Sequence, residues 1–291
     1  MTRHKLSKCT EKELLGMRSD LFKNGFVLLN LNSTDLSEFE LFTKKFSSDF
    51  HEVGTRQSLK DKSGDGYTTK TSAENYILLG HSEGMYRPYP PPPNICFFMC
   101  VIPPNSLGGE TTIVDGVQLL NSLPQDLKNK LITFGVIYQS KWKPSRWQAE
   151  FCVETEKSLK AILNGLPEFD YSIENGILNL RSRMKAVHKT HAGLLAFANG
   201  ILAHLPRINH PRYSELPVFL NSTNALYFGN GELFSEAEIN QMIDAYDQNL
   251  IKHSWEAGDI LMLDNMRFMH GRMQTAKKCE RLILSRFGWL T

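Results

Sequence analysis

An imidazole and a carboxylate one residue apart are the side chains best suited to hold a metal in this sequence: His81 and Glu83. They end an apolar, strand-like run, YILLGHSE. Residues i and i+2 of a strand point to the same face, so both side chains can reach one ion. Such a pair supplies two of the three ligands of the facial triad that suits Fe(II) and leaves other positions of the ion open.

The third ligand should be a histidine that is distant in the sequence and brought in by a neighbouring strand. His270 fits, because it follows the β-rich run GDILMLDN and precedes a further strand. H-x-E pairs also arise by chance, and the chain has nine histidines. His188 and His191 have helical spacing, but Thr190 and Gly193 indicate a turn, and no carboxylate stands beside them. We interpret those two as surface or core residues. The same interpretation covers the other five: His4, His51, His204, His210 and His253.

The elements that must position these residues are short strands bounded by Gly, Pro and Asn. We expect strands at 26–31, 76–83, 95–102, 111–116, 194–199, 225–228, 259–265 and 281–290. Helical spacing predicts helices at 10–25, 35–46, 122–133, 146–163 and 235–250. Many short strands with helices between them predict a mainly β fold, a sandwich or jelly roll with helical additions. The polar segment 54–72 and the proline-rich segment 86–93 are expected to be loops.

Composition limits the possible partners. Of 291 residues, 41% are apolar and 22% are charged, as in an ordinary globular protein with a core. The net charge of +2 is too small to indicate nucleic acid or an anionic membrane as a partner, and no apolar run approaches the roughly 20 residues of a membrane span. We expect no secretory signal, and Cys96 and Cys100 in CFFMC should be packed thiols. These features favour a reduced, cytoplasmic protein of unknown oligomeric state.

Four blocks, in order, resemble the TauD/TfdA family of Fe(II)/2-oxoglutarate-dependent dioxygenases: LGHSEGMY, ICFFMCVIPPNSLGGETTIVDG, GDILMLDNMRFMHGR and RLILSRFG. The glutamate of the first block resembles the clavaminate synthase-like branch of that family. The similarity covers most of the chain, including GFVLLNL, SRWQAEF, KAVHKTHAGLLAFAN and YFGNGELFS. It implies one domain over residues 1–291, with a cupin-like double-stranded β-helix (jelly roll) flanked by helices. A helical insertion at about 118–250 would interrupt the β core.

The resemblance also implies the site. His81, Glu83 and His270 match the iron ligands, while Thr111 and Arg281 match residues that bind the distal carboxylate of 2-oxoglutarate. Arginine suits that task, because its planar fork donates two parallel hydrogen bonds to a carboxylate.

Strand alternation separates the neighbouring arginines. Arg281, Ile283 and Ser285 should share one face of their strand, and Arg286 should lie on the other. Arg272 is expected to be either a charge close to the ligands or a structural one.

The implied cofactors are Fe(II), 2-oxoglutarate and O2. The implied reaction is oxidation of a small molecule, by default hydroxylation of an amino acid or a natural-product intermediate of secondary metabolism, with release of succinate and CO2. Desaturation or cyclisation is the alternative outcome. A non-catalytic cupin-like protein that binds zinc or a small molecule, and a metal-dependent hydrolase on a jelly roll, also stay open. Candidate substrate contacts are Arg56, Tyr67, Tyr86, Arg87 and Asn199.

Overall fold

The computed structural model describes most of the chain and all of the expected β core. The described residues are 4–5, 10–51, 65–71, 75–86, 89, 91–205, 210–213, 225–277 and 279–291. No helix among them is long and apolar enough to cross a membrane.

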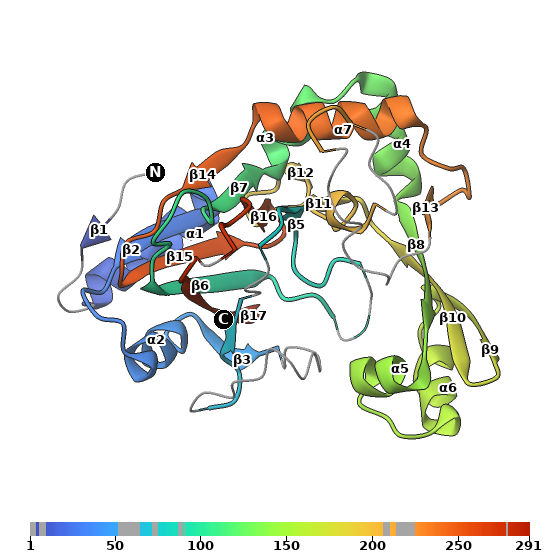
Figure 1. Cartoon of the computed structure of the whole chain (residues 1–291), viewed down its shortest axis with the longest axis horizontal. Coiled ribbons are helices and arrows are strands. Elements are labelled where there is room, and N and C mark those ends of the chain that lie inside the picture. The colour runs from blue at the N-terminus through green and yellow to red at the C-terminus, as the bar shows by residue number, and fades with distance from the viewer. Residues whose placement is uncertain are drawn as a thin grey trace.

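Two sheets, antiparallel except for the parallel pair β1–β2, face each other in the left half of Figure 1. The major sheet has the order β1-β2-β15-β6-β17-β3, and β4 also pairs with β17. The minor sheet has the order β14-β7-β16-β5. The major strands are β1 (His4–Lys5), β2 (Phe26–Asn30), β3 (Ser47–Phe50), β4 (Thr69–Lys70), β6 (Ile95–Ile102), β15 (Asp259–Asp264) and β17 (Leu282–Leu290). The minor strands are β5 (Leu78–His81), β7 (Thr111–Asp115), β14 (Ile251–His253) and β16 (Phe268–Arg272).

Strand β6 is almost entirely apolar because both of its faces are buried. Cys96 and Phe98 belong to the apolar cluster between the two sheets, whereas Phe97 and Met99 belong to a cluster on the outer face of the major sheet. Helices α1 (Glu11–Asn24) and α2 (Leu36–Thr43) contribute Met17, Leu21, Phe39 and Phe42 to that outer cluster. A strand buried on both faces has no polar face to alternate with, so it shows no period of two. The jelly roll flanked by helices that the sequence predicts is confirmed.

Helix α1 begins and ends where the sequence predicts. Thr10 caps its N-terminus in a capping box with Glu13, and Gly25 ends it in the left-handed conformation, with φ of 76°. A Cβ at Gly25 would also lie 2.7 Å from the side chains of Arg267 and Phe268. Glycine is therefore required there both by the backbone conformation and by the close approach of the segment before His270.

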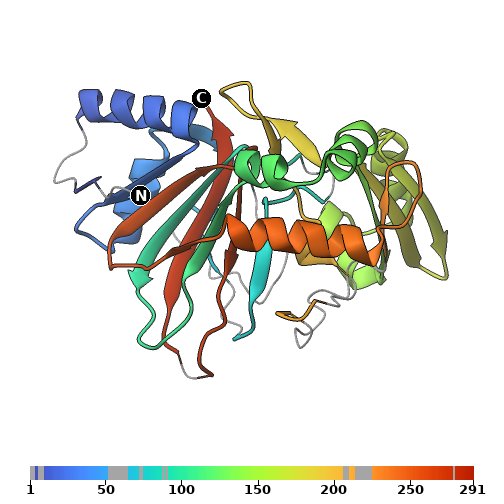
Figure 2. The same ribbon diagram turned by 90° about the horizontal axis from the view of Figure 1, so that it is seen from above.

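The residues between β7 and β14 form an inserted body, most of which lies on the right of Figures 1 and 2. Its helices α3 and α7 pack against the minor sheet, and α7 runs along the top of Figure 1 toward β14. This body has its own sheet, β13-β8-β10-β9, and a hairpin of β11 and β12. Its strands are β8 (Val136–Trp142), β9 (Phe169–Glu174), β10 (Ile177–Met184), β11 (Val187–Lys189), β12 (Leu195–Phe197) and β13 (Ala225–Phe228). Its helices are α3 (Gly116–Ser122), α4 (Gln125–Phe134), α5 (Pro144–Phe151), α6 (Glu156–Asn164), α7 (Glu236–Gln248) and the 3-10 turn η2 (Leu202–His204).

The sequence prediction was incomplete in this inserted body. Strands β8, β9 and β10 were missed, because polar or charged residues interrupt their apolar runs; in β10, for instance, Leu178 and Leu180 are buried and Arg183 is exposed. The helix expected at 146–163 is two helices, because Cys152 ends α5 in the left-handed conformation, with φ of 53°. The assignment of the whole chain to one domain remains a prediction.

Candidate metal centre

Strand pairing brings the two predicted histidine ligands together. His81, the last residue of β5, lies opposite His270 in the antiparallel pair β5–β16, and the centroids of the two rings are 4.5 Å apart. Glu83 follows two residues later, and its Oε2 lies 3.9 Å from His81 Nε2. One potential ligand atom from each of these three residues lies within 4.8 Å of the others. Among the described residues, no other group of histidine, cysteine and carboxylate side chains has such a geometry.

The surroundings of both imidazoles suit a metal. His81 Nδ1 lies 3.3 Å from the carbonyl oxygen of Leu79, to which it can donate, so Nε2 keeps its lone pair on the side of Glu83. His270 is buried, and its Nδ1 has no hydrogen-bond partner among the described residues. Burial, together with the neighbouring His81, holds the pKa of His270 well below its usual value. Two imidazoles next to a carboxylate fit a divalent ion such as Fe(II).

Ser82, the residue between the two ligands of the H-x-E motif, fixes this segment to the β core. Its hydroxyl donates to the carbonyl of Phe268 on β16 (3.1 Å), and its amide donates to the carbonyl of Asn199 (2.9 Å). Ser82 is fully buried. The end of β5 is therefore held at the strand that carries His270.

Asn265 fixes the backbone of Glu83 itself. Its side chain accepts from the amide of Glu83 (2.8 Å) and donates to the carbonyls of Glu83 (2.9 Å) and Pro93 (2.8 Å). The side chain is fully buried, and it accepts one hydrogen bond and donates two. The sequence analysis missed Asn265, although its position directly after the buried strand β15 was a usable signal.

A half-buried cation, Arg281, lies just before β17 of the major sheet and reaches Thr111 on the minor sheet. Arg281 donates to the carbonyl of Gly109 (2.9 Å) and to the hydroxyls of Thr71 (3.0 Å) and Thr111 (3.4 Å). All three acceptors are neutral, and no ion pair among the described residues includes Arg281. Burial and the nearby Arg272 lower the pKa of Arg281 to about 10, which leaves it charged at neutral pH. A half-buried guanidinium among neutral partners favours the binding of an anion.

The other two arginines take different positions. Arg272 is buried on β16, opposite Thr111 of β7, and donates to the carbonyl of Tyr76 (3.1 Å). It therefore lies beside Arg281. Arg286 pairs with Phe97 of β6, whose side chain lies in the outer cluster. The alternation along β17 thus places Arg286 on the face away from the metal ligands, as the sequence predicts.

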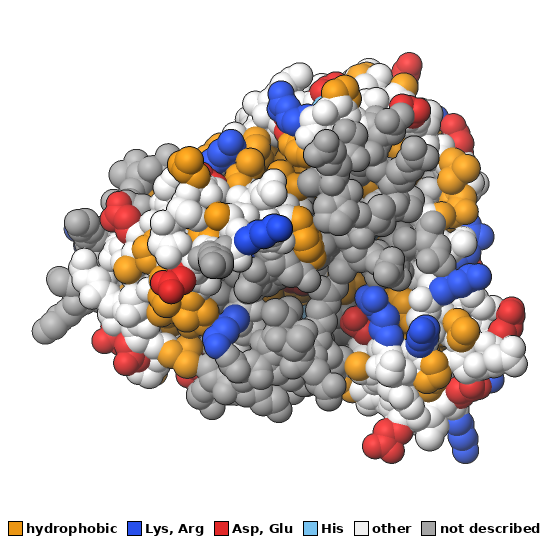
Figure 3. Space-filling view, viewed as in Figure 1, with side chains coloured by type: hydrophobic (Ala, Val, Ile, Leu, Met, Phe, Trp, Pro, Cys, Tyr) orange, Lys and Arg blue, Asp and Glu red, His pale blue; other side chains and the backbone are white. Residues whose placement is uncertain are grey.

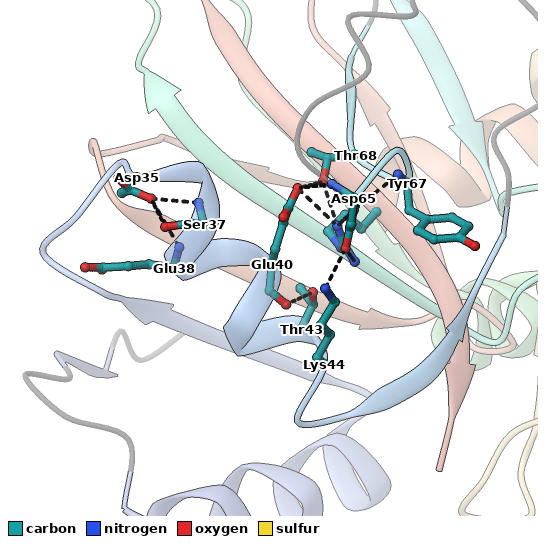
Figure 4. A network of polar contacts seen from close by, with 10 residues as sticks. Asp35, Ser37, Glu38, Glu40, Thr43, Lys44, Asp65, Tyr67 and Thr68 are labelled. Atoms are coloured by element: carbon teal, nitrogen blue, oxygen red, sulfur yellow. Dashed lines mark hydrogen bonds and ion pairs between the residues drawn. The ribbon is translucent and has the colours of Figure 1, made fainter.

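Arg286 belongs to a polar cluster between α2 and the major sheet. It donates to both carboxylate oxygens of Asp65 (2.7 and 2.9 Å) and to Thr68 Oγ1 (2.8 Å). Glu40 Oε1 is 3.7 Å from the same guanidinium. Figure 4 shows Asp65, Glu40 and Thr68 turned toward one point, with the Tyr67 ring pointing away from it. These contacts make Arg286 a structural residue.

The predicted substrate residues are dispersed. Tyr67 packs with the outer cluster, its ring 6.0 Å from that of Phe50, apart from the three ligands. Tyr86, three residues after Glu83, lies against the ring of His204 at 4.7 Å. Arg56 and Arg87 lie outside the described residues.

Asn199 is buried, and its side chain is occupied by backbone groups. It donates to the carbonyl of Ala186 (2.7 Å) and accepts from the amide of Ile201 (2.9 Å). Its own carbonyl holds Ser82. Asn199 therefore supports the H-x-E segment.

Most histidines outside the candidate centre have structural contacts. His191 Nδ1 lies 3.0 Å from Asp264 Oδ2, and that hydrogen bond raises the pKa of His191. His210 contacts Asp244 at 3.2 Å. Burial lowers the pKa of His188 to about 4. These contacts agree with the reading of the three as surface or core residues.

The surface in front of the β core is hollowed. Figure 3 shows a hollow between the β core on its left and the inserted body on its right, with lysine and arginine side chains on both sides.

A jelly roll that presents two histidines on paired strands, with a carboxylate two residues beyond one of them, has the ligand set of the 2-His-1-carboxylate iron oxygenases. The family model described as taurine catabolism dioxygenase TauD, TfdA family matches residues 5–287. The chain therefore belongs to this family, whose members are 2-oxoglutarate-dependent dioxygenases that use Fe(II) and O2. No curated protein sequence matches the chain significantly.

Solved structures of oxygenases share the fold at low sequence identity. A taurine dioxygenase from Burkholderia xenovorans is 13% identical, with 97% of this chain and 81% of that chain covered and a TM-score of 0.59. AAD-2 in complex with Mn(II) and N-oxalylglycine is 13% identical, with 96% and 87% covered and a TM-score of 0.55. Asparagine oxygenase in complex with Fe(II), 2S,3S-3-hydroxyasparagine and succinate is 11% identical, with 95% and 78% covered and a TM-score of 0.57.

Proposed function

We propose that this protein hydroxylates a small molecule, an amino acid or a natural-product intermediate, with His81, Glu83 and His270 as its iron ligands. Thr111 and Arg281 bind the distal carboxylate of 2-oxoglutarate in this proposal. When bound, iron supplies the activation of O2 and the oxidative decarboxylation of 2-oxoglutarate to succinate and CO2. The chain's own residues hold the ion, orient the co-substrate and substrate, and exclude water.

The observation that carries the proposal is the spacing between the three ligands and Arg281. His270 pairs with Ile113 of β7, and Thr111, which contacts Arg281, lies two residues further along that strand. Two residues of a strand span about 6.6 Å, the scale of a five-carbon diacid. One end of 2-oxoglutarate can therefore reach the metal while the other meets Arg281 and Thr111. A zinc-binding protein or a hydrolase on the same fold would have no use for this second, anion-binding position.

The substrate class rests on similarity and on the retained carboxylate. Two of the similar structures are oxygenases of taurine and of asparagine, which are both small amino compounds. Glu83 would hold the ion as its carboxylate ligand, and a bound iron would then have no extra open site for a halide. Hydroxylation is then the default outcome. A cytoplasmic location and a role in secondary metabolism stay predictions from the sequence.

The test is O2-dependent succinate formation by the Fe(II)-loaded protein with a panel of amino acids and their derivatives. We expect one group of related compounds to raise the succinate yield above the substrate-free level. Mass analysis then separates hydroxylation, which adds one oxygen atom, from desaturation or cyclisation, which removes two hydrogen atoms. Metal binding without binding of 2-oxoglutarate would contradict the proposal and favour the zinc-binding or hydrolase alternatives.

A further inference from the structure

Trp255 contacts the hydroxyl group of Thr111, which binds 2-oxoglutarate in the proposed function. Its indole Nε1 donates to Thr111 Oγ1 over 2.9 Å, and both side chains are buried. Trp255 belongs to the apolar cluster between the two sheets and not to the outer surface. The bond therefore lies inside the jelly roll, on the same sheet as His270.

The number of donors around Thr111 determines where its own proton can go. A threonine hydroxyl has one proton and two lone pairs, whereas an indole N–H and a guanidinium can only donate. Trp255 donates to Thr111 Oγ1, and Arg281 Nη2 donates to the same atom over 3.4 Å. Both lone pairs are then in use. Among the described residues, no acceptor receives the Thr111 proton.

We propose that Trp255 is a positioning residue that turns the Thr111 hydroxyl into an obligatory donor toward the distal carboxylate of 2-oxoglutarate. This inference rests on the proposed function. Thr111 and Arg281 then offer only donors at that end of the pocket. An ionised carboxylate, which only accepts, satisfies them, whereas a carboxamide would direct its own N–H groups against donors. Trp255 thus helps the site select a diacid over the corresponding amide.

The surroundings of Trp255 hold its ring in place. His253 packs against the indole edge to face, with centroids 4.4 Å apart and planes at 79°. His253 also lies opposite Thr111 in the pairing of β14 with β7, two strands that are neighbours in Figure 1. Asp259, which is fully buried, lies 3.7 Å from His253 Nε2. The strand that carries Thr111 and the segment that carries Trp255 are therefore fixed relative to each other.

Trp255→Phe tests the inference, because it keeps an aromatic ring and removes the donor. Protein loaded with Mn(II) is titrated without O2, first with 2-oxoglutarate and then with its distal amide, 2-oxoglutaramate. We expect affinity for 2-oxoglutarate to fall roughly three- to tenfold, as for one lost hydrogen bond, while Mn(II) affinity is unchanged. The ratio of the affinity for 2-oxoglutarate to the affinity for 2-oxoglutaramate should decrease. The matched control is Trp147→Phe, which removes a buried indole bond of 2.9 Å to the carbonyl of Gly176.

A double-mutant cycle separates this role from simple packing. In a Thr111→Val background, Trp255→Phe should cause no further loss of 2-oxoglutarate affinity. Equal losses in both backgrounds, or an unchanged diacid preference in Trp255→Phe, would overturn the inference and leave the proposed function intact. If wild-type protein binds Mn(II) but not 2-oxoglutarate, the proposed function itself fails.

A second measurement needs no change at Trp255, in case that variant does not fold. The chain has four tryptophans, so its nitrogen-15 spectrum should hold four indole N–H signals. One of the four should move in Thr111→Val, and the same signal should move when 2-oxoglutarate binds to the wild-type protein. If the signal that responds to Thr111→Val does not respond to 2-oxoglutarate, the inference is overturned.

Discussion

His81 and His270 lie directly opposite each other on paired antiparallel strands, so the register of β5 against β16 sets the distance between their rings. The register shifts between His270 and Arg272. Glu83 lies beyond the end of β5 and depends on side-chain hydrogen bonds for its position. Backbone pairing thus places the two histidines, and Asn265 places the carboxylate. Different variants therefore test the two kinds of positioning.

Glu83→Ala tests the carboxylate ligand. The variant should fold normally, bind Fe(II) more weakly and lose nearly all hydroxylation, because it removes one negative charge and opens an additional position on the ion. Any recovered activity should depend on an added small anion that fills the vacancy. Bound iron and succinate yield are the measurements.

The matched control for this variant is Glu154→Ala, which removes an exposed carboxylate of the inserted body. It should keep both wild-type values. If Glu83→Ala also kept both, Glu83 would be a surface acid beside a histidine and the H-x-E motif would have no role.

Arg281→Ala tests the anion-binding position. The variant should lose roughly ten- to a hundredfold in affinity for 2-oxoglutarate, since a hydrogen-bonded charge typically contributes about 1.5–3 kcal/mol. Its metal affinity should change little. Titration of Mn(II)-loaded protein measures both, and Arg183→Ala, which removes a largely exposed arginine paired with Asp170, is the control. An unchanged 2-oxoglutarate affinity would make Arg272 the better candidate.

Arg286→Ala should act on stability and not on the site. Removing one partner of a buried ion pair typically costs about 3–5 kcal/mol. The loss here should lie at the lower end of that range, because Lys44 still pairs with Asp65 at 3.0 Å. Denaturant unfolding should show this loss, whereas metal affinity of the folded variant should match that of the wild type. A variant of normal stability that failed to bind 2-oxoglutarate would show that the alternation along β17 was misread.

The same cluster predicts a dependence on pH. Partial burial raises the pKa of Asp65, but hydrogen bonds from Arg286 and Lys44 outweigh it and hold that pKa well below its usual value. A lowered pKa contributes stability above the unfolded value of about 4, and this is lost as the pH falls through the folded value. Between about pH 5 and about pH 3, wild-type protein should therefore lose more stability than Arg286→Ala. Equal losses in parallel unfolding curves would contradict this.

The sequence was informative where local chemistry decides the structure and less so where tertiary contacts do. The alternation of Ile283 and Arg286 follows from strand geometry alone. Glu83, by contrast, lies beyond the end of β5 and is held by Asn265, which the H-x-E spacing does not record. Strand β16 was not recognised, because Gly271 and Arg272 interrupt its apolar pattern, although both are buried. The positions of Tyr67 and Asn199 depend on which surfaces pack together, and no local pattern records that.

The final prediction compares two buried asparagines with matching hydrogen bonds. Asn265 accepts from one amide and donates to the carbonyls of Glu83 and Pro93. Asn30 likewise accepts from the amide of Asn32 and donates to two oxygens, those of Ala257 and Asp259, but it contacts no metal ligand.

Asn265→Ala and Asn30→Ala should therefore both lower the free energy of unfolding, each by about 1–3 kcal/mol for the buried groups left unpaired. Only Asn265→Ala should also weaken metal binding, because only Asn265 fixes the backbone from which the Glu83 carboxylate reaches the ion. Fe(II) or Mn(II) titration of the folded variants separates the two effects, since stability and metal affinity are then measured independently. Equal metal affinities in the two variants would mean that Glu83 keeps its position without Asn265, and that strand pairing alone sets the geometry of the centre.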